Sequence, residues 1–91
     1  MMSEESANAL AAMMQNVVEQ GTGTAARLEG VDVSGKTGTA EIDIARGINT
    51  LWFIGFTDRF AVAVVFERVQ GGTGGTIAAP VAKAVLESLG E

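Results

Sequence analysis

Apolar residues in the first part of the chain recur at spacings of three and four, the period of an amphipathic helix. The residues on this face are Ala7, Leu10, Ala11, Met14, Val17 and Val18. Ser3 is a suitable N-cap, and the two acids that follow it are favoured by the helix dipole. Gly21 is a suitable end because glycine accepts the left-handed conformation in which many helices stop. The pattern therefore predicts a helix over residues 3–20.

From Val31 onwards the apolar period changes to two, which is typical of strands. The predicted elements are strands over about residues 31–42, 51–56 and 60–69, and a last helix over about residues 77–89. The three residues between the second and third strands fit a tight hairpin. Pro80 is tolerated in the last helix only near its first turn, because it has no N–H to donate further in. The intervening segments, 21–30, 43–50 and 71–76, are predicted to be loops.

The order helix, strand, strand, strand, helix predicts an α/β fold: a three-stranded antiparallel meander with helices packed against it. The third predicted strand is apolar on both alternating faces as far as Phe66, so both of its faces should be covered. With 91 residues, of which 47% are hydrophobic and 19% charged, the chain has globular composition and amounts to one domain or part of one.

Composition excludes several kinds of chemistry. There is no cysteine and no histidine, which excludes a disulfide scaffold, thiol catalysis, a zinc site and a histidine general base. No metal site and no cofactor are predicted. The six basic residues are scattered and the net charge is −5, which argues against a nucleic-acid surface. No apolar run approaches the roughly 20 residues of a membrane span.

One motif matches a well-known pattern in the wrong context. Residues 30–37 read GVDVSGKT and fit the phosphate-binding P-loop, G-x-x-x-x-G-K-[ST], letter for letter. A P-loop needs a strand before it and a helix after it, so that the helix N-terminus faces the phosphates. Here a loop precedes the motif, a strand pattern runs through it, and poor helix formers follow Thr37. We therefore predict that the chain binds no nucleotide.

The same lysine has a better explanation in Lys36-Thr37-Gly38, the K-T-G element of serine β-lactamases and penicillin-binding proteins. A ligand that ends in a carboxylate needs a cation, hydroxyl donors and a close approach to a strand edge. Lys36 supplies the cation, Thr37 and Thr39 supply hydroxyls, and Gly38 has no side chain to keep a ligand away. The alternative is a solvated lysine on an edge strand, beside threonines that favour β structure.

The surroundings of this element agree with a known family. Residues 21–26 read GTGTAA, residues 34–41 read SGKTGTAE, residues 52–56 read WFIGF and residues 78–81 read AAPV. This succession, over about residues 3–89, closely resembles the C-terminal third of the transpeptidase domain of penicillin-binding proteins. The resemblance implies that Lys36, Thr37, Gly38 and Thr39 bind the carboxylate of the substrate or of a β-lactam. It also implies that the backbone N–H of Thr39 serves in the oxyanion hole. Among the aromatic residues, which fit sheet packing, only Trp52 is a candidate for lining the pocket, because its predicted strand lies next to that of Lys36.

The nucleophile of that family is missing. Its S-x-x-K motif has a serine three residues before a lysine, but Val33 precedes Lys36 at that distance and Pro80 precedes Lys83. Ser6 and Asn8 match the accompanying S-x-N motif, yet their place in the first helical turns is explained by capping. Ser34 has no base to activate it. The chain is therefore expected to carry one wall of an active site and no catalytic activity alone.

The resemblance also implies where the parent protein acts and what it binds. The parent would be a membrane-anchored, extracytoplasmic DD-transpeptidase of peptidoglycan synthesis, and its partners would be a peptidoglycan stem peptide or a β-lactam. Two alternatives remain: a β-lactamase or β-lactam sensor, and a non-catalytic binding or structural module of the same fold. The family's sheet has two further strands from the N-terminal end of the domain, which would leave the third predicted strand without a neighbour. We therefore expect the chain to associate with itself or with the remainder of a parent protein.

Overall fold

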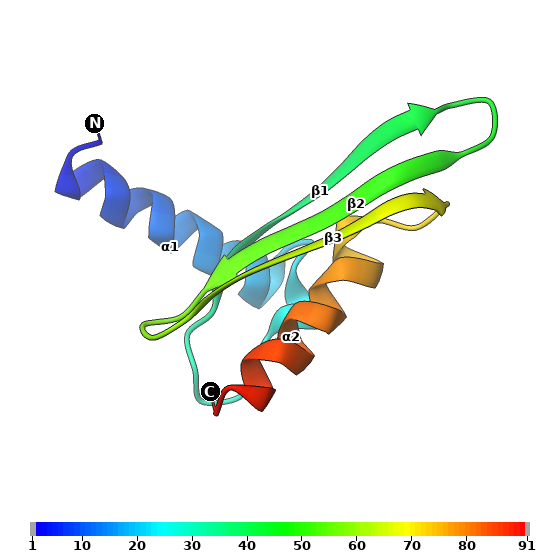
Figure 1. Ribbon diagram of the computed structural model, residues 1–91. Helices are drawn as coiled ribbons and strands as arrows, with labels where there is room; N and C mark the ends of the chain where they lie inside the picture. Colours follow the sequence, from blue (N-terminus) through cyan, green and yellow to red (C-terminus); the bar gives the residue numbers. More distant parts are fainter. Residues whose placement is uncertain (1, 91) are drawn as a thin grey trace.

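The computed structural model describes residues 2–90 and has one three-stranded sheet with helices packed against it (Figure 1). Its elements are helix α1 (Glu4–Gln20), the 3-10 turn η1 (Thr24–Ala26), strands β1 (Ser34–Asp43), β2 (Ile48–Phe56) and β3 (Ala61–Gln70), the π-helical turn η2 (Gly74–Ala78) and helix α2 (Ala79–Ser88). The strands pair antiparallel in the order β1-β2-β3. The predicted α/β meander is confirmed.

Helix α1 begins and ends where the sequence signals lie. The Ser3 side chain accepts a hydrogen bond from the Ser6 backbone N–H at 3.1 Å, and the Gly21 N–H donates to the Val17 carbonyl at 3.0 Å. Only Val18 of this helix is fully buried, and the N-terminal half projects away from the sheet (Figure 1). Its predicted apolar face is therefore covered at the C-terminal end alone, and Leu10 remains 40% exposed.

The core lies on one face of the sheet, under α2. Phe53 of β2 is completely buried there, and Ala82 and Leu86 of α2 close over it together with Val18 of α1. Phe53 fits so closely because glycines flank it. A Cβ on Gly35 would overlap the Phe53 ring, and a Cβ on Gly55 would lie only 2.7 Å from the ring's Cε2.

Three boundaries differ from the predicted ones by two residues or more. β1 begins at Ser34, not at Val31, because the chain turns at Gly30 (φ +78°) and Val31 forms only an isolated bridge with Leu28. β2 begins at Ile48, since the connection after β1 is a turn of four residues, 44–47, which the left-handed Gly47 (φ +67°) closes.

The last helix also begins differently. The segment 74–78 forms a single π-helical turn that starts at Thr73 with a capping box, in which Thr73 and Thr76 bond each other's backbone N–H. Helix α2 then begins at Ala79, not at residue 77, and ends at Ser88, with Pro80 in its first turn. Residue 77 lies in the π turn because the capping box at Thr73 starts this turn four residues earlier.

The faces of β3 are covered unequally. Val62, Val64 and Phe66 pack against the core and are half-buried, whereas Ala61, Ala63 and Val65 are exposed on the opposite face. β3 pairs with β2 alone among the strands of residues 2–90, so its outer edge is unpaired. The expectation that both faces would be covered is therefore not met within this chain.

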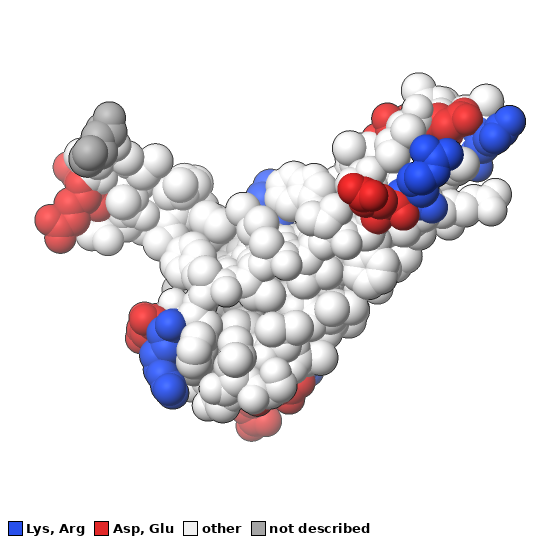
Figure 2. All heavy atoms as spheres, viewed as in Figure 1, with Lys and Arg blue, Asp and Glu red and all other residues white. Residues whose placement is uncertain are grey.

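Charged side chains gather on the projecting parts of the molecule. Figure 2 shows acidic residues at the free end of α1 and residues of both signs at the tip of the β1–β2 hairpin, with a surface between them that is largely uncharged apart from a basic side chain at its upper edge. At that tip Arg46 and Asp43 form an exposed ion pair of 3.6 Å. No helix in residues 2–90 is long and apolar enough to span a membrane.

Candidate functional site

The K-T-G segment lies in the middle of β1, which is an edge strand because, in the described part of the chain, it pairs with β2 alone. Its residues oppose those of β2 in the pairs Lys36–Ile54, Thr37–Phe53, Gly38–Trp52 and Thr39–Leu51. Because side chains alternate along a strand, Lys36 and Gly38 share the open face of the sheet, and Thr37 and Thr39 share the core face. The four residues thus present two chemically different faces and a free backbone edge.

Lys36 supplies an exposed positive charge to this strand. Its side chain is exposed, and its Nζ donates a hydrogen bond of 2.7 Å to the carbonyl oxygen of Thr37. Within residues 2–90 no carboxylate lies within 4.0 Å of this ammonium group. The charge is therefore held against the strand by a neutral acceptor and stays available to an anion.

The two threonine hydroxyls are each engaged by a different loop. The Thr37 side chain is buried, with 8% of the residue exposed, and its Oγ1 lies 2.7 Å from Oγ1 of Thr22. Thr39 is exposed, and its Oγ1 accepts a hydrogen bond of 3.3 Å from the Gly74 backbone N–H. The loop after α1 and the turn before α2 thus converge on this segment of β1.

Gly38 is enclosed on both faces of the sheet. A Cβ on Gly38 would overlap the Trp52 indole, which therefore covers it on the open face. On the core face Gly74 lies so close that a Cβ added to it would be 2.7 Å from the Gly38 carbonyl oxygen. The sequence suggested that Gly38 keeps the strand clear for a ligand. In the structure the missing side chain makes room for Trp52 and Gly74, so only the strand edge is left for a ligand.

The serines considered as nucleophiles are held by hydrogen bonds of their own. Ser6 belongs to the capped first turn of α1, where its hydroxyl accepts a bond of 3.1 Å from the Ser3 hydroxyl. The Ser34 hydroxyl donates to the carbonyl oxygen of Ala11 at 3.2 Å, which ties β1 to α1. Both serines therefore have structural hydrogen bonds.

Sequence reasoning missed Thr22, Gly74 and Gly75 as parts of this site. Residues 21–30 and 71–76 were predicted to be loops, and residues 21–26 also supported the resemblance, but neither segment was assigned to the site. In the structure a Cβ on Gly75 would overlap the Thr22 carbonyl oxygen, so the two glycine-rich segments touch each other beside β1. The signal was the high glycine content of both segments, which allows backbones to approach closely.

The P-loop pattern has no P-loop geometry here. Gly30 lies in a tight turn, Gly35 and Lys36 lie within β1, and the strand continues to Asp43 without a helix. No helix N-terminus follows the motif to receive a phosphate.

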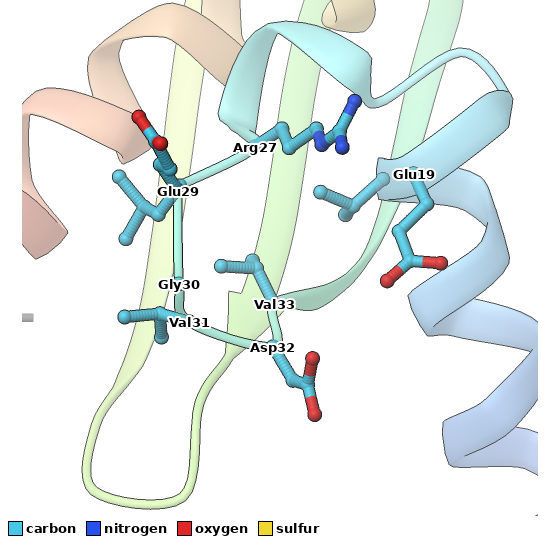
Figure 3. Close-up of a pocket in the computed structure, with 9 residues that line it drawn as sticks. Glu19, Arg27, Glu29, Gly30, Val31, Asp32 and Val33 are labelled. Atoms are coloured by element: carbon cyan, nitrogen blue, oxygen red, sulfur yellow. The ribbon is translucent and has the colours of Figure 1, made fainter.

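A separate hollow beside this turn has a volume of about 310 Å³ and contains charged side chains (Figure 3). Its acids, Glu19, Glu29 and Asp32, point in different directions, and Arg27 lies between the first two in the picture. No group of three or more metal-ligating side chains occurs in the described part of the chain. This hollow includes none of the K-T-G residues and does not form a convergent binding site.

Comparison with known proteins agrees with this geometry. Residues 1–87 match the family model of the penicillin-binding protein transpeptidase domain, so the chain belongs to that family. Among curated proteins it is 35% identical, over 72 residues, to penicillin-binding protein 1A/1B of Bacillus subtilis, covering 69% of this chain.

Solved structures give the same result. The transpeptidase domain of the FtsI4 D,D-transpeptidase from Legionella pneumophila superposes over 99% of this chain with a TM-score of 0.83 and 32% identity. The D,D-transpeptidase domain of a peptidoglycan glycosyltransferase from Eggerthella lenta covers 98% of this chain with a TM-score of 0.77 and 40% identity. Penicillin-binding protein A from M. tuberculosis, solved as a ceftriaxone acyl-enzyme complex, superposes with a TM-score of 0.81 and 32% identity.

The chain spans only a part of each of these proteins. It corresponds to 37% of the Legionella chain, 22% of the Eggerthella chain and 8% of the Bacillus protein. The remaining length of such proteins has no counterpart in these 91 residues.

Proposed function

We propose that this chain is the C-terminal segment of a peptidoglycan DD-transpeptidase domain and forms the wall that binds the carboxylate of a stem peptide or a β-lactam. Lys36 provides the positive charge, Thr37 and Thr39 provide hydroxyl groups, and the Thr39 backbone N–H provides one oxyanion-hole donor. The parent protein acts outside the cytoplasmic membrane. The observation that carries the proposal is the Lys36 ammonium, which is exposed on an edge strand that also carries Thr37 and Thr39, and whose hydrogen-bond partner within residues 2–90 is a neutral carbonyl.

The direction of the β1 backbone supports the role of Thr39. In an antiparallel edge strand, residues that do not bond the neighbouring strand point their N–H and C=O to the free edge, and these residues alternate. Because the Lys36 ammonium reaches the Thr37 carbonyl, this carbonyl faces outwards. The Thr39 N–H, two residues further on, then points to the same free edge. A preorganised donor of this kind contributes about 3–4 kcal/mol in acyl transfer.

The nucleophile comes from the remainder of the parent protein in this proposal. The unpaired edge of β3 and the exposed apolar face of the sheet are the surfaces on which that remainder packs. Ile54 (44% exposed) and Val65 (60% exposed) lie on this face. Both belong to strands whose opposite face is packed against the core.

Titration of the 91-residue chain with penicillin and with its methyl ester tests the carboxylate site. The two ligands differ only in the charged group, so a carboxylate site prefers the acid. We expect the acid to shift the backbone amide signals of residues 36–39 in NMR spectra, and the ester to bind at least about tenfold more weakly, because a charge-assisted hydrogen bond is worth about 1.5–3 kcal/mol.

Lys36→Met should remove the preference for the acid. Lys83→Met is the matched control, since Lys83 lies on α2, away from β1. Equal binding of acid and ester by the native chain, or equal loss of binding in the two variants, would contradict the proposal.

A further inference from the structure

Thr22 holds one of the two hydroxyls of the proposed site. Its Oγ1 lies 2.7 Å from Oγ1 of Thr37, fifteen residues further along the chain, and this contact is partly buried. Thr37 itself is 8% exposed, so its side chain has little freedom to turn towards water. The hydroxyl of Thr37 therefore takes the orientation that Thr22 allows.

The position of Thr22 is itself fixed by its backbone. The N–H groups of Gly21 and Gly23, on either side of it, both donate to the Val17 carbonyl at 3.0 Å. From the other side, Gly75 packs against the Thr22 carbonyl so closely that no Cβ would fit. Thr22 is thus clamped between the end of α1 and the η2 turn, and its hydroxyl is presented to β1 from a rigid support.

The chemistry of the two hydroxyls determines which of them donates in this contact when a carboxylate is bound. Each threonine hydroxyl has one proton to donate and two lone pairs that accept. A carboxylate only accepts, so Thr37 can bond it only with its own proton, and Thr22 must then be the donor to Thr37. Hydrogen bonds in such a chain polarise one another, so a bond from Thr22 strengthens the bond from Thr37 to an anion.

We propose that Thr22 is a positioning residue of the carboxylate site, which donates its proton to Thr37 and thereby leaves the Thr37 O–H directed at the ligand. This inference rests on the proposed function. It adds a residue outside the K-T-G segment, and it assigns a role to residues 21–23 beyond ending α1.

Thr22→Val tests the inference because valine keeps the shape and removes the hydroxyl. We expect penicillin to bind about two- to tenfold more weakly, the effect of one neutral hydrogen bond. We also expect the Thr37 side chain to populate more than one χ1 rotamer, measured by three-bond NMR couplings to its methyl carbon. Thr22→Ser keeps the hydroxyl and should bind like the native chain. Thr24→Val, in the same loop, is the matched control and should change neither quantity.

The outcomes separate the two proposals. If the native chain binds the penicillin acid no better than its methyl ester, the proposed function fails. If the native chain binds selectively but Thr22→Val binds equally well with an unchanged Thr37 rotamer, only the positioning role fails. A Thr22→Val effect that persists in a Thr37→Val background would also overturn it, since the two hydroxyls would then act independently. A thermal melt of each variant shows whether the fold is retained.

Discussion

The Trp52 indole occupies the space in which a side chain at position 38 would lie. The two residues are direct partners across β1 and β2, and Trp52 is the single tryptophan of the sequence. Gly38→Ala should therefore displace the ring and lower the free energy of unfolding by about 1–3 kcal/mol, the usual cost of overpacking. Urea denaturation followed by tryptophan fluorescence measures the stability, and the emission maximum of the folded variant reports the ring's displacement.

A double-mutant cycle identifies the cause. In a Trp52→Ala background the obstruction is absent, so adding Gly38→Ala should cost less by at least about 0.5 kcal/mol. Far-UV circular dichroism follows the unfolding of all four variants of the cycle, because Trp52→Ala removes the single tryptophan. Equal costs in both backgrounds would mean that Gly38 is needed for a reason other than Trp52.

Arg68 lies in a left-handed conformation, with φ +55°, on β3. It belongs to a bulge in which Glu67 and Arg68 stand opposite the single residue Thr50. A non-glycine residue in this conformation costs about 1–2 kcal/mol of stability. Glycine would relieve this strain, but the greater entropy of its unfolded state takes back about 0.5–1 kcal/mol. Arg68→Gly should therefore raise the free energy of unfolding by about 0.5–1 kcal/mol.

The neighbouring residue is the control for this prediction. Glu67 has no positive φ, so Glu67→Gly should destabilise the chain by about 0.5–1 kcal/mol. Chemical denaturation of both variants measures the free energy of unfolding, which should rise in Arg68→Gly and fall in Glu67→Gly. A loss of stability in Arg68→Gly as large as that in Glu67→Gly would show that the bulge does not strain Arg68.

Local signals were sufficient to predict the elements but not all of their ends. The helical period and the Ser3 cap located α1, because both depend only on nearby residues. The start of β1 was placed three residues early because Val31 and Val33 alternate like strand residues, while the turn at Gly30 prevents them from pairing with β2. Pairing is a tertiary property, and a period of two does not report it.

Only part of the site could be predicted, again because tertiary contacts cannot be read from the local sequence. The chemistry of Lys36 and the two threonines could be read from their side chains alone. The contacts of Thr22 and Gly74 with this segment could not, because they join residues separated by 15 and 35 positions. Their glycine-rich surroundings indicate close backbone approach without naming the partner.

Despite its complete P-loop string, the chain should bind neither ATP nor GTP. Gly35, Lys36 and Thr37 lie in an extended strand, where successive N–H groups point in opposite directions and form no phosphate-binding nest. Calorimetric titration with Mg-ATP and Mg-GTP should give no measurable heat of binding at micromolar protein. A magnesium-dependent dissociation constant in the micromolar range, abolished by Lys36→Met, would refute this.

Penicillin should not acylate the isolated chain. No serine stands three residues before either lysine, and the Ser34 hydroxyl is bonded to the Ala11 carbonyl. Intact-mass spectrometry after incubation with excess penicillin should show the unmodified mass, while a complete penicillin-binding protein treated in parallel gains one acyl group. Stoichiometric acylation of this chain would show that it contains its own nucleophile.

β3 presents two features that favour association between chains. Its outer edge is unpaired within residues 2–90, and its exposed face carries Val65, which is 60% exposed next to the partly buried Trp52. Unpaired strand edges beside apolar side chains recruit further strands. The net charge of −5 opposes this weakly, because salt screens charges beyond about 8–10 Å.

The isolated chain should therefore self-associate at micromolar concentration, which sedimentation velocity measures. Val65→Lys places a charge on the exposed face of β3 and should shift the distribution towards the 9.4 kDa monomer. Ile44→Lys is the matched control, because Ile44 is 79% exposed in the β1–β2 turn, away from that face, and its replacement should leave association unchanged. A native chain that sediments as a single 9.4 kDa species and melts cooperatively would show that the three-stranded sheet is stable with its edge and face uncovered.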